Sequence, residues 1–428
     1  MIINNVKGLS GEITVPGDKS ISHRSIMFGS LAKGDTEVYG FLQGADCLSS
    51  INCFRKMGIN IENDGDRVVI HGKGLRGLEE PDGILDVGNS GTTIRLMSGI
   101  LAAQKFTARV NGDSSIQKRP MGRIMKPLSM MGADIKSIND NDCAPLIING
   151  KKLKGIHYNS PVASAQVKSG VLFAGLYADG ETSVTEPYVS RNHTELMLKD
   201  YGADIKTVGK TVTVKPVEEL YARRIDVPGD ISSAAYFIAA GLIADNSALT
   251  IKNVGINPTR DGIIEVCRKM DADIEIKEND NQSAEPVADI TVKTSKLKAC
   301  TIGGELIPRL IDEIPIIAVM ACYAEGTTII KDAQELKVKE SNRIDSIVNN
   351  LKLMGADVTA TEDGMVINGN PDKGLRGAQI DSKLDHRIAM SFTIAGLIAE
   401  GDTEIIGSEC VDISYPNFYE TLDRICKI

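Results

Sequence analysis

Hydrophobic and polar positions along the chain repeat one pattern six times. In each copy an apolar helical run is followed by a turn and then by a strand that contains Thr or Ser. The copies end at Thr36, Thr107, Thr182, Ser247, Thr328 and Thr403. Successive differences between these positions are 71, 75, 65, 81 and 75, against about 71 for a sixth of 428 residues. The chain is therefore built from six related units.

A second marker falls between these copies and keeps the same period. It follows a helical pattern and precedes an alternating strand at Met131-Gly-Ala-Asp134, Tyr201-Gly-Ala-Asp204, Met270-Asp-Ala-Asp273, Met354-Gly-Ala-Asp357 and, more loosely, Met57-Gly-Ile-Asn60. Gly suits a helix C-terminus, where φ is positive. Hairpin-like strands follow, such as those at 68–72 and 365–369. Each unit thus reads as βαβαββ, and the alternative of chance Gly-Ala-Asp strings is disfavoured because two independent markers agree.

One six-residue segment also recurs about half the chain length later, and we call its two copies the echo sequences. Val15-Pro-Gly-Asp-Lys-Ser20 returns as Val227-Pro-Gly-Asp-Ile-Ser232, 212 positions later. We therefore expect two α/β domains of three units each, residues 1–18 plus 228–428 and residues 19–227. The sixth copy stops at its helix, Asn417 to Ile428, so we expect its missing strands from the N-terminus, Ile2 to Val15. Both chain ends would then lie in one domain.

Composition is that of a globular protein too long for a single core, with 42% apolar and 25% charged residues. Trp is absent and aromatic residues make up 4%, so the core must consist mainly of Ile, Leu, Val, Ala and Met. A net charge of −9 disfavours a nucleic-acid or membrane partner, although it leaves room for a local basic pocket. The N-terminus lacks the pattern of a signal peptide, and apolar stretches such as 388–399 are too short to span a bilayer. We expect a cytoplasmic protein.

The eight cysteines contain no CxxC pair and no Cys/His spacing suited to zinc. We interpret them as buried free thiols in a reducing compartment. No pair of His residues has the spacing of metal ligands, so we expect no metal. The glycines of Gly72 to Gly77 match GxGxxG, but the string leaves a hairpin strand instead of opening a helix, which argues against dinucleotide binding.

Basic residues recur beside Gly, Ser or Asn in turn-like strings, several of them where a strand gives way to a helix. These strings are Asp18–Arg24, Gly88–Arg95, Gln117–Pro120, Ser190–His193, Lys337–Arg343 and Asp385–Arg387. Free backbone N–H groups at a helix start favour an anion, and Arg adds bidentate recognition of phosphate and carboxylate. One such residue alone would be a solvated surface charge, but their repetition predicts a shared anion site. For His23 and His386, which each precede an Arg, we favour hydrogen bonding and orientation over proton transfer.

Five of these strings, in chain order, carry a resemblance to a known family. They are Pro16-Gly-Asp-Lys-Ser20, Gly88-Asn-Ser-Gly-Thr92, Lys118-Arg-Pro-Met121, Lys337-Val-Lys-Glu-Ser341 with Arg343, and Asp385-His-Arg-Ile-Ala-Met390. From about residue 7 to 427 the chain resembles the 5-enolpyruvylshikimate-3-phosphate synthases, a branch of the enolpyruvyl transferases. The resemblance implies two domains of three βαβαββ units, an active site in the interdomain cleft, no cofactor, and a monomer.

Carried over residue by residue, the resemblance implies two ligand sets. The set for shikimate 3-phosphate is Lys19, Ser20, Arg24, Ser164, Gln166, Arg191, Asp312 and Lys339. The set for phosphoenolpyruvate is Lys19, Gly91, Arg119, Gln166, Arg343 and Arg387, supported by Asn89 and Arg95. Asp312 resembles the base on the shikimate 5-hydroxyl. Glu340 and Lys19 resemble the groups that deliver and remove the proton at C3 of the enolpyruvyl group, and which of them delivers it stays open.

The implied reaction joins the 5-hydroxyl to C2 of phosphoenolpyruvate and then expels phosphate from a tetrahedral intermediate, a step of chorismate and aromatic amino acid biosynthesis. Two phosphates and two carboxylates must be held together against their repulsion, which explains the Lys and Arg cluster. The chain departs from some members of the family at Ile413, where they carry a Lys. Arg191 and Ala165 resemble the branch that lacks this Lys.

Three other functions fit the sequence less well. A transferase acting on a UDP-amino sugar shares the fold and the donor, but it usually has Asn after the early Lys and a Cys on a loop. Here Ser20 follows Lys19, and the segment 111–123 contains no Cys. A nucleic-acid module or RNA-terminus cyclase is disfavoured by the acidic charge and the scarcity of aromatic residues. A non-catalytic phosphate-binding protein is disfavoured by Asp312 and Glu340.

Overall fold

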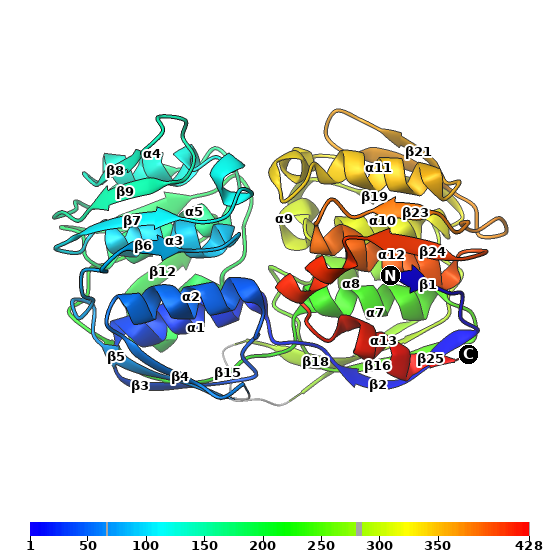
Figure 1. Cartoon of the computed structure of the whole chain (residues 1–428), viewed down its shortest axis with the longest axis horizontal. Helices are drawn as coiled ribbons and strands as arrows, with labels where there is room; N and C mark the ends of the chain where they lie inside the picture. Colours follow the sequence, from blue (N-terminus) through cyan, green and yellow to red (C-terminus); the bar gives the residue numbers. More distant parts are fainter. Residues whose placement is uncertain (66, 280–284, 428) are drawn as a thin grey trace. The chain divides into compact units, whose positions relative to one another are not determined.

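The computed structural model describes residues 1–65, 67–279 and 285–427, and the last residue of the expected terminal helix, Ile428, lies outside them. The chain forms two compact units (Figure 1). The middle unit consists of Gly17–Val227, and the terminal unit combines Met1–Pro16 with Pro228–Ile428. Each unit has its own hydrophobic core.

The middle unit contains three successive repeats. The first repeat comprises α1 (Lys19–Leu31), β3 (Ala32–Tyr39), α2 (Ala45–Lys56), β4 (Asn60–Asn63), β5 (Arg67–Lys73) and the late strands β14 (Leu220–Tyr221) and β15 (Arg224–Asp226). The second comprises β6 (Ile84–Asp86), α3 (Gly91–Leu101), β7 (Thr107–Asn111), η1 (Ile116–Lys118), α4 (Gly122–Met130), β8 (Asp134–Ser137) and β9 (Leu146–Asn149). The third comprises β10 (His157–Asn159), α5 (Ala165–Gly175), β11 (Thr182–Thr185), α6 (His193–Asp200), β12 (Ile205–Val208) and β13 (Thr211–Val214).

The terminal unit contains the other three repeats. The fourth comprises β2 (Gly8–Thr14), α7 (Ile231–Ile243), β16 (Ala248–Gly255), α8 (Gly262–Lys269), β17 (Ile274–Glu278) and β18 (Val287–Lys293). The fifth comprises β19 (Thr301–Ile302), η2 (Gly304–Leu306), α9 (Ile307–Leu310), α10 (Ile314–Cys322), β20 (Gly326–Ile330), η3 (Gln334–Val338), α11 (Arg343–Leu353), β21 (Asp357–Ala360) and β22 (Met365–Gly369). The sixth comprises β23 (Gln379–Asp381), α12 (His386–Ile398), β24 (Thr403–Ile406), η4 (Ser408–Ile413), α13 (Phe418–Ile425) and β1 (Ile2–Ile3), whereas the following strand β25 (Cys426–Lys427) pairs with β2 in the sheet of the fourth repeat.

Each repeat builds one small mixed sheet, as the second repeat illustrates. Its strands lie in the order β6-β7-β9-β8. The first two strands are parallel, with Leu85 opposite Val110, because α3 makes the crossover between them. The hairpin of β8 and β9 returns antiparallel, with Ala108 opposite Ile148. The predicted βαβαββ unit is confirmed.

The strands before the two echo sequences are exchanged between the units. β2 pairs in parallel with β16 in the terminal unit, although the chain continues from it into α1. β14 and β15 pair in parallel with β3 in the middle unit, although the chain continues from them into α7. The expectation that Ile2 to Val15 completes the sixth repeat was therefore wrong for β2. Of the two N-terminal strands, β1 is the one that pairs with β24 of the sixth repeat. β16 and β3 can each pair in parallel with a further strand. The local sequence does not specify whether that strand is β2 or the pair β14 and β15.

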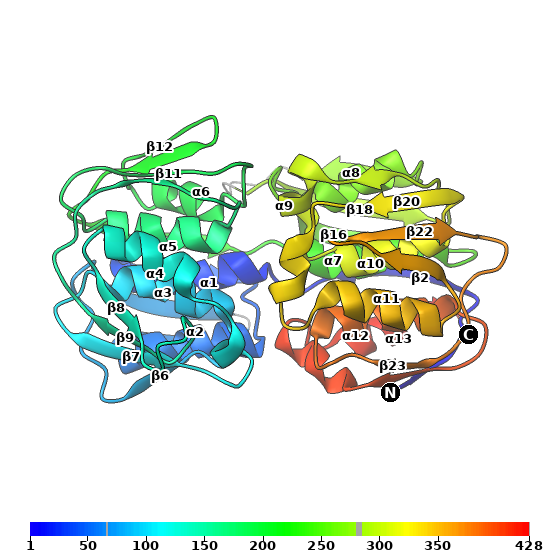
Figure 2. The same cartoon turned by 90° about the horizontal axis from the view of Figure 1, so that it is seen from above.

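The first long helix of every repeat is an inner helix that is buried over most of its length. All thirteen residues of α7 and all nine of α10 are buried. A helix that is hydrophobic all round must be enclosed by other elements. In the middle unit α1, α3 and α5 lie side by side (Figure 2). α3 and α5 approach closely at Gly99 and Gly170, because a Cβ on Gly99 would stand 1.9 Å from the Gly170 carbonyl oxygen.

The second helix of each repeat is amphipathic and covers the inner helix and sheet from outside. In α13 the buried residues are Phe418, Thr421, Leu422 and Ile425, a spacing of one helical face. After these helices the marker residue has positive φ, +94° at Gly132 and +57° at Asp271 of the Met-Asp-Ala-Asp variant. The marker therefore ends a helix, as predicted from its Gly.

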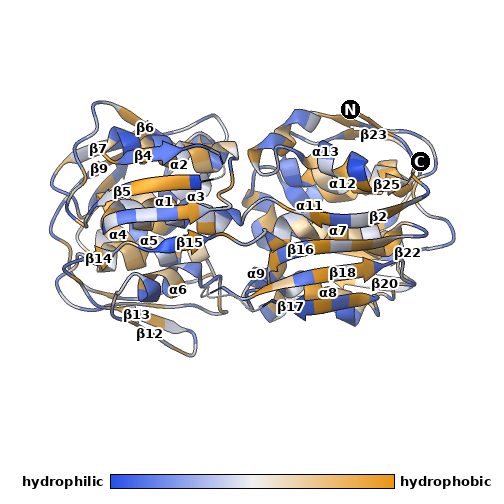
Figure 3. Cartoon of the chain, turned by 90° about the horizontal axis from the view of Figure 1, so that it is seen from below, coloured by the Kyte–Doolittle hydropathy of each residue, from blue (hydrophilic) through white to orange (hydrophobic). Residues whose placement is uncertain are grey.

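The cores are mainly aliphatic, with a few aromatic residues at helix contacts. Phe28 lies 4.9 Å from Phe173 and 5.2 Å from Tyr201 between ring centroids, which joins α1, α5 and α6. Figure 3 colours much of strands such as β5 and β18 as hydrophobic, and the apolar residues of these strands are buried. Within the described residues, no helix is long and apolar enough to cross a membrane.

Candidate active site

The residues singled out in the sequence lie at the N-terminal ends of helices or in the loops before them. In the middle unit these are Lys19, Ser20 and Arg24 of α1, Asn89, Gly91 and Arg95 around the start of α3, Arg119 before α4, Ser164 and Gln166 at the start of α5, and Arg191 before α6. In the terminal unit they are Asp312 before α10, Lys339, Glu340 and Arg343 around the start of α11, and Arg387 in the first turn of α12.

Side chains cap the starts of these helices and leave other backbone N–H groups available. The Asp18 carboxylate accepts from the N–H of Ile21 at 2.9 Å. The Ser90 hydroxyl accepts from the N–H of Thr93 at 3.1 Å. Because free N–H groups and the helix dipole favour negative charge, the adjacent starts of α1, α3 and α5 form an anion-attracting end of the middle unit.

Lys19, the first residue of α1, forms an ion pair with Asp46 of α2. The exposed fractions of the two side chains are 17% and 8%, so the ammonium group is held largely away from solvent. Deeper in α1, Arg24 is buried and donates to the Ser20 carbonyl at 2.9 Å, to Ser169 of α5 at 2.8 Å and to Thr194 of α6 at 2.7 Å. Arg24 thus joins three helices beneath Ser20.

His23 lies in a buried hydrogen-bonded network between the starts of α1 and α3. Its Nδ1 lies 2.8 Å from the Ser50 hydroxyl, which contacts the Thr93 hydroxyl at 2.8 Å. The Thr93 hydroxyl in turn donates to Ser90 at 2.7 Å. Burial, with Lys19 and Arg24 nearby, holds the pKa of His23 well below its usual value. The ring is therefore neutral, which suits a hydrogen-bonding and orienting role.

Two guanidinium groups lie close to Gly91. A Cβ built on Gly91 would stand 2.7 Å from Arg95 Nη1 and 2.9 Å from Arg119 Nη1. Arg95 donates to the Gln166 side-chain oxygen at 2.8 Å, and Gln166 donates to the Thr92 hydroxyl at 3.0 Å. Arg119 donates to the Asn89 carbonyl at 3.3 Å. The contacts bring five predicted residues of two repeats into one cluster.

Ser164 and Arg191 are connected through a carboxylate that the sequence analysis did not single out. Ser164 caps α5 and donates its backbone N–H to Glu186 at 2.8 Å. The other oxygen of Glu186 accepts from the N–H of Ser190 at 3.2 Å and from its hydroxyl at 2.8 Å. Arg191 follows directly in the loop before α6.

In the terminal unit Arg343 is the centre of a carboxylate cluster. Its guanidinium lies 2.7 Å from Glu340, 2.8 Å from Asp385 and 3.3 Å from Asp312. Lys339 reaches the same Asp312 oxygen at 3.2 Å. Burial would lower the pKa of Arg343, but these carboxylates raise it, led by Asp385. Arg343 is 1% exposed and stays charged.

Asp385 received no role in the sequence analysis, although it is the most buried carboxylate of this cluster, 0% exposed. It caps α12 by accepting from the N–H of Arg387 at 3.0 Å, and it accepts from Ser341 at 3.0 Å. Burial would raise the pKa of Asp385, whereas Arg343 lowers it, so the carboxylate is ionised. Its only sequence signal was its place in the string Asp385-His386-Arg387, where a strand gives way to a helix.

Asp385→Asn should lower the free energy of unfolding at pH 7 by about 2 kcal/mol, since it replaces a charge-assisted contact with a neutral one but keeps the cap. Because the folded-state pKa of Asp385 lies below the usual value, this difference should be full above about pH 4 and shrink as the pH falls further. Urea unfolding of both proteins between pH 7 and 3 measures it. A difference that grows on acidification would contradict this assignment. Asp402→Asn at an exposed position is the control.

Behind Arg387 lies a second buried group of ionic residues that the sequence analysis missed. Arg260 donates to Asp230 at 3.1 Å and to Ser232 at 2.7 Å, and Ser232 contacts Glu313. Burial works against the charged form of Arg387, but Asp312, Glu313 and Asp230 raise its pKa. No local pattern joins these residues, which come from three different segments of the chain.

Two further sequence expectations concern metals and Ile413. In the described parts of the chain, no group of three or more His, Cys, Asp or Glu side chains could hold a metal ion. Ile413 ends η4 and is partly buried against the core of the terminal unit, so it takes part in packing.

The chain is similar to known proteins over nearly its whole length. It matches the family model described as EPSP synthase (3-phosphoshikimate 1-carboxyvinyltransferase) over residues 3–422. A 3-phosphoshikimate 1-carboxyvinyltransferase of Thermoanaerobacter sp. (strain X514) is 57% identical over 97% of this chain and 98% of its own. That of Bacillus cereus (strain AH187) is 55% identical over 99% and 98%. A solved structure of EPSP synthase from Acinetobacter baumannii superposes with a TM-score of 0.88 at 47% identity, covering 99% of this chain and 97% of that one.

Proposed function

This chain belongs to the EPSP synthase (3-phosphoshikimate 1-carboxyvinyltransferase) family, and we propose that it transfers the enolpyruvyl group of phosphoenolpyruvate to the 5-hydroxyl of shikimate 3-phosphate. The reaction releases phosphate and serves aromatic amino acid biosynthesis. The family, the mixed α/β fold and the transferase function expected from the sequence are confirmed. The alternative of a UDP-amino-sugar transferase is not favoured.

The observation that carries the proposal is that the predicted basic residues of each unit lie at helix starts. The middle unit supplies Lys19, Arg24, Arg95, Arg119 and Arg191, and the terminal unit supplies Lys339, Arg343 and Arg387. Each substrate carries a phosphate and a carboxylate, so their close approach is strongly unfavourable without such cations. We assign both substrates to these helix starts and infer that both units contribute to one reaction.

Within the middle unit we assign phosphoenolpyruvate to Lys19, Gly91, Arg119 and Gln166. Arg95 and the Asn89 carbonyl support this set by holding Gln166 and Arg119. We assign shikimate 3-phosphate to Lys19, Ser20, Arg24, Ser164, Gln166 and Arg191. Arg24 also donates to groups on three helices, and its contact to the Ser20 carbonyl fixes the backbone there.

In the terminal unit we assign Asp312 as the base that accepts the proton of the 5-hydroxyl. Lys339 and Arg343 both contact one oxygen of Asp312, which stabilises the carboxylate form that a base needs. Lys339 also belongs to the shikimate 3-phosphate set, and Arg343 and Arg387 belong to the phosphoenolpyruvate set. The carboxylates around these arginines orient their guanidinium groups.

The proton at C3 must be delivered when the hydroxyl adds and removed when phosphate leaves. Glu340 is ion-paired with Arg343 at 2.7 Å, which opposes its protonation before substrates bind. The ammonium of Lys19 carries a proton that it can donate. We therefore assign Lys19 as the donor and the Glu340 carboxylate as the group that removes the proton.

Glu340→Gln should then accumulate the tetrahedral intermediate in quenched reactions. Absence of this intermediate would contradict the assignment of proton removal to Glu340.

Gly91→Ala should weaken the inhibitor glyphosate more than it weakens phosphoenolpyruvate. The resemblance places both next to Gly91, with glyphosate slightly the longer, and the new methyl would displace the tips of Arg95 and Arg119. Overpacking of this kind costs about 1–3 kcal/mol, and the longer ligand needs the lost space more. Gly91 does not have positive φ, so Ala should leave the fold intact. Inhibition and Michaelis constants measure the two effects, and equal fold-changes would defeat the steric account.

The assay that tests the proposed function measures phosphate release from phosphoenolpyruvate with two acceptors. Release is expected with shikimate 3-phosphate and not with UDP-N-acetylglucosamine. Release with the UDP-sugar alone, or with neither acceptor, would overturn it. We further propose a cytoplasmic monomer, as expected from the sequence and from the family resemblance. Sedimentation of the purified protein tests the oligomeric state.

A further inference from the structure

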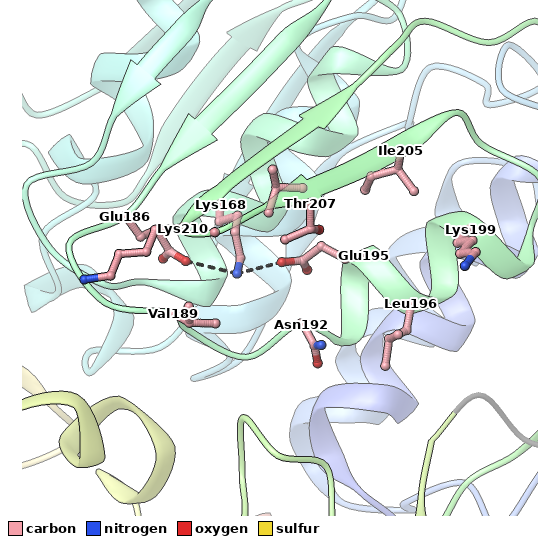
Figure 4. A pocket seen from close by; sticks show the side chains of 12 residues that line it. Lys168, Glu186, Val189, Asn192, Glu195, Leu196, Lys199, Ile205, Thr207 and Lys210 are labelled. Carbon is pink, nitrogen blue, oxygen red and sulfur yellow. Dashed lines mark ion pairs between the residues drawn. The ribbon is translucent and has the colours of Figure 1, made fainter.

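A buried lysine in the middle unit has no part in the chemistry assigned so far. Lys168 lies on α5, one turn after Ser164, and its side chain is 2% exposed. Its ammonium group lies 3.0 Å from Glu186 and 2.7 Å from Glu195 of α6, and it donates to the Ser190 carbonyl at 3.3 Å. Figure 4 shows the nitrogen between the two carboxylates. Burial would lower the pKa of Lys168, but Glu195 and Glu186 raise it, so the ammonium group of Lys168 stays charged.

A buried ion pair of this kind costs desolvation and is weak evidence for stability alone. The contacts of Glu186 suggest another use. One of its oxygens holds the N–H of Ser164, and the other holds the N–H and hydroxyl of Ser190. Glu186 therefore ties the cap of α5 to the loop 186–192, and Lys168 fixes Glu186 from the core side.

The loop 186–192 is exposed except where these contacts hold it. Tyr188 and Val189 are 39% and 44% exposed, and a pocket of about 310 Å³ opens between the loop, α6 and the hairpin of β12 and β13 (Figure 4). Lys210 of that hairpin donates to the Pro187 carbonyl at 2.6 Å and lies 5.2 Å from the Tyr188 ring centroid. Because a pocket lies on one side of the loop, the position of the segment that carries Arg191 depends on polar contacts, among them those of Glu186 to Ser190.

We propose that Lys168, Glu186 and Glu195 form a positioning triad that places Ser164 and Arg191 for shikimate 3-phosphate, and that the triad does not act on phosphoenolpyruvate. This inference rests on the proposed function. Gln166, which we assign to both substrates, is held separately by Arg95 and Thr92. The triad therefore affects the acceptor side of the site selectively.

Glu186→Gln tests the proposal, because it keeps the size of the side chain and removes the charge that holds Lys168 and Ser190. We expect the KM for shikimate 3-phosphate to rise about tenfold or more, with the KM for phosphoenolpyruvate changed less than about twofold. Lys168→Met should shift the same constant, and Lys168→Arg should restore much of the loss. Lys199→Met, at an exposed position lining the same pocket, is the matched control and should behave as wild type.

A general loss of folding would not produce this split between the two Michaelis constants. If Glu186→Gln fails to fold, Ser190→Ala removes only one hydroxyl contact and should raise the same KM severalfold. Equal rises for both substrates, unchanged constants, or a fall in kcat alone would overturn the positioning role. Activity of wild type and of Lys199→Met shows in the same experiment that the proposed function stands independently.

Discussion

Lys19→Met is expected to lower kcat/KM at least about a hundredfold, or about 2.7 kcal/mol of transition-state stabilisation. Lys19 is the first residue of α1, and its ammonium group lies beside Asp46, largely shielded from solvent. A cation in such a setting interacts more strongly with an anion than it would in water. We assign it to both substrates and to proton donation, so its loss affects binding and chemistry together. Steady-state kinetics with both substrates varied measure the effect.

The same substitution should leave the fold intact. Asp46 loses its partner, so the thermal midpoint is expected to fall by a few degrees, corresponding to about 1 kcal/mol in a unit of this size. Quenched reactions of the variant should contain no tetrahedral intermediate. Lys105→Met, at an exposed position of the same unit, controls for loss of a positive charge. Turnover near the wild-type value would remove Lys19 from the mechanism.

Asp312→Asn is expected to lower kcat by about 10²- to 10⁴-fold, the usual contribution of a general base. The amide oxygen can still accept from Lys339 and Arg343, which contact one oxygen of Asp312 at 3.2 and 3.3 Å. The Michaelis constants should therefore change much less than kcat. This split distinguishes a lost base from a disrupted binding site.

The matched control for this prediction is Asp402→Asn, which removes a carboxylate from an exposed position of the same unit. Circular dichroism and thermal melting check that Asp312→Asn is folded. A kcat within tenfold of wild type would exclude Asp312 as the base. A large rise in both Michaelis constants with unchanged kcat would instead make Asp312 a binding residue.

Periodic features of the structure could be read from the sequence because they depend on neighbours along the chain. The marker at Met131 to Asp134 ends a helix because Gly132 readily adopts positive φ. Helix starts such as Asp18 and Ser90 are local capping signals. Repetition of both signals indicates six βαβαββ units and places the basic strings before their helices. The identities of the site residues came from motif resemblance, which extends along the whole chain.

Contacts between distant segments could not be read in this way. Arg343 and Asp385 are 42 positions apart, and Arg24 and Thr194 are 170 apart. Lys168 was a lone cation in an apolar helix, and nothing nearby in the sequence identified Glu186 or Glu195 as its partners. Both pairings of Lys168 require α5, α6 and the loop 186–192 to be packed first.

The sequence by itself determined the repeat, its secondary structure and the chemical character of the helix starts, because capping, turn geometry and hydrophobic period act over a few residues. Only the tertiary structure decided that β2 pairs with β16 while β14 and β15 pair with β3. It also decided which carboxylate neutralises each buried cation. Parallel sheet edges and buried ion pairs accept any strand or carboxylate of suitable chemistry, so the packing of the whole unit selects among them.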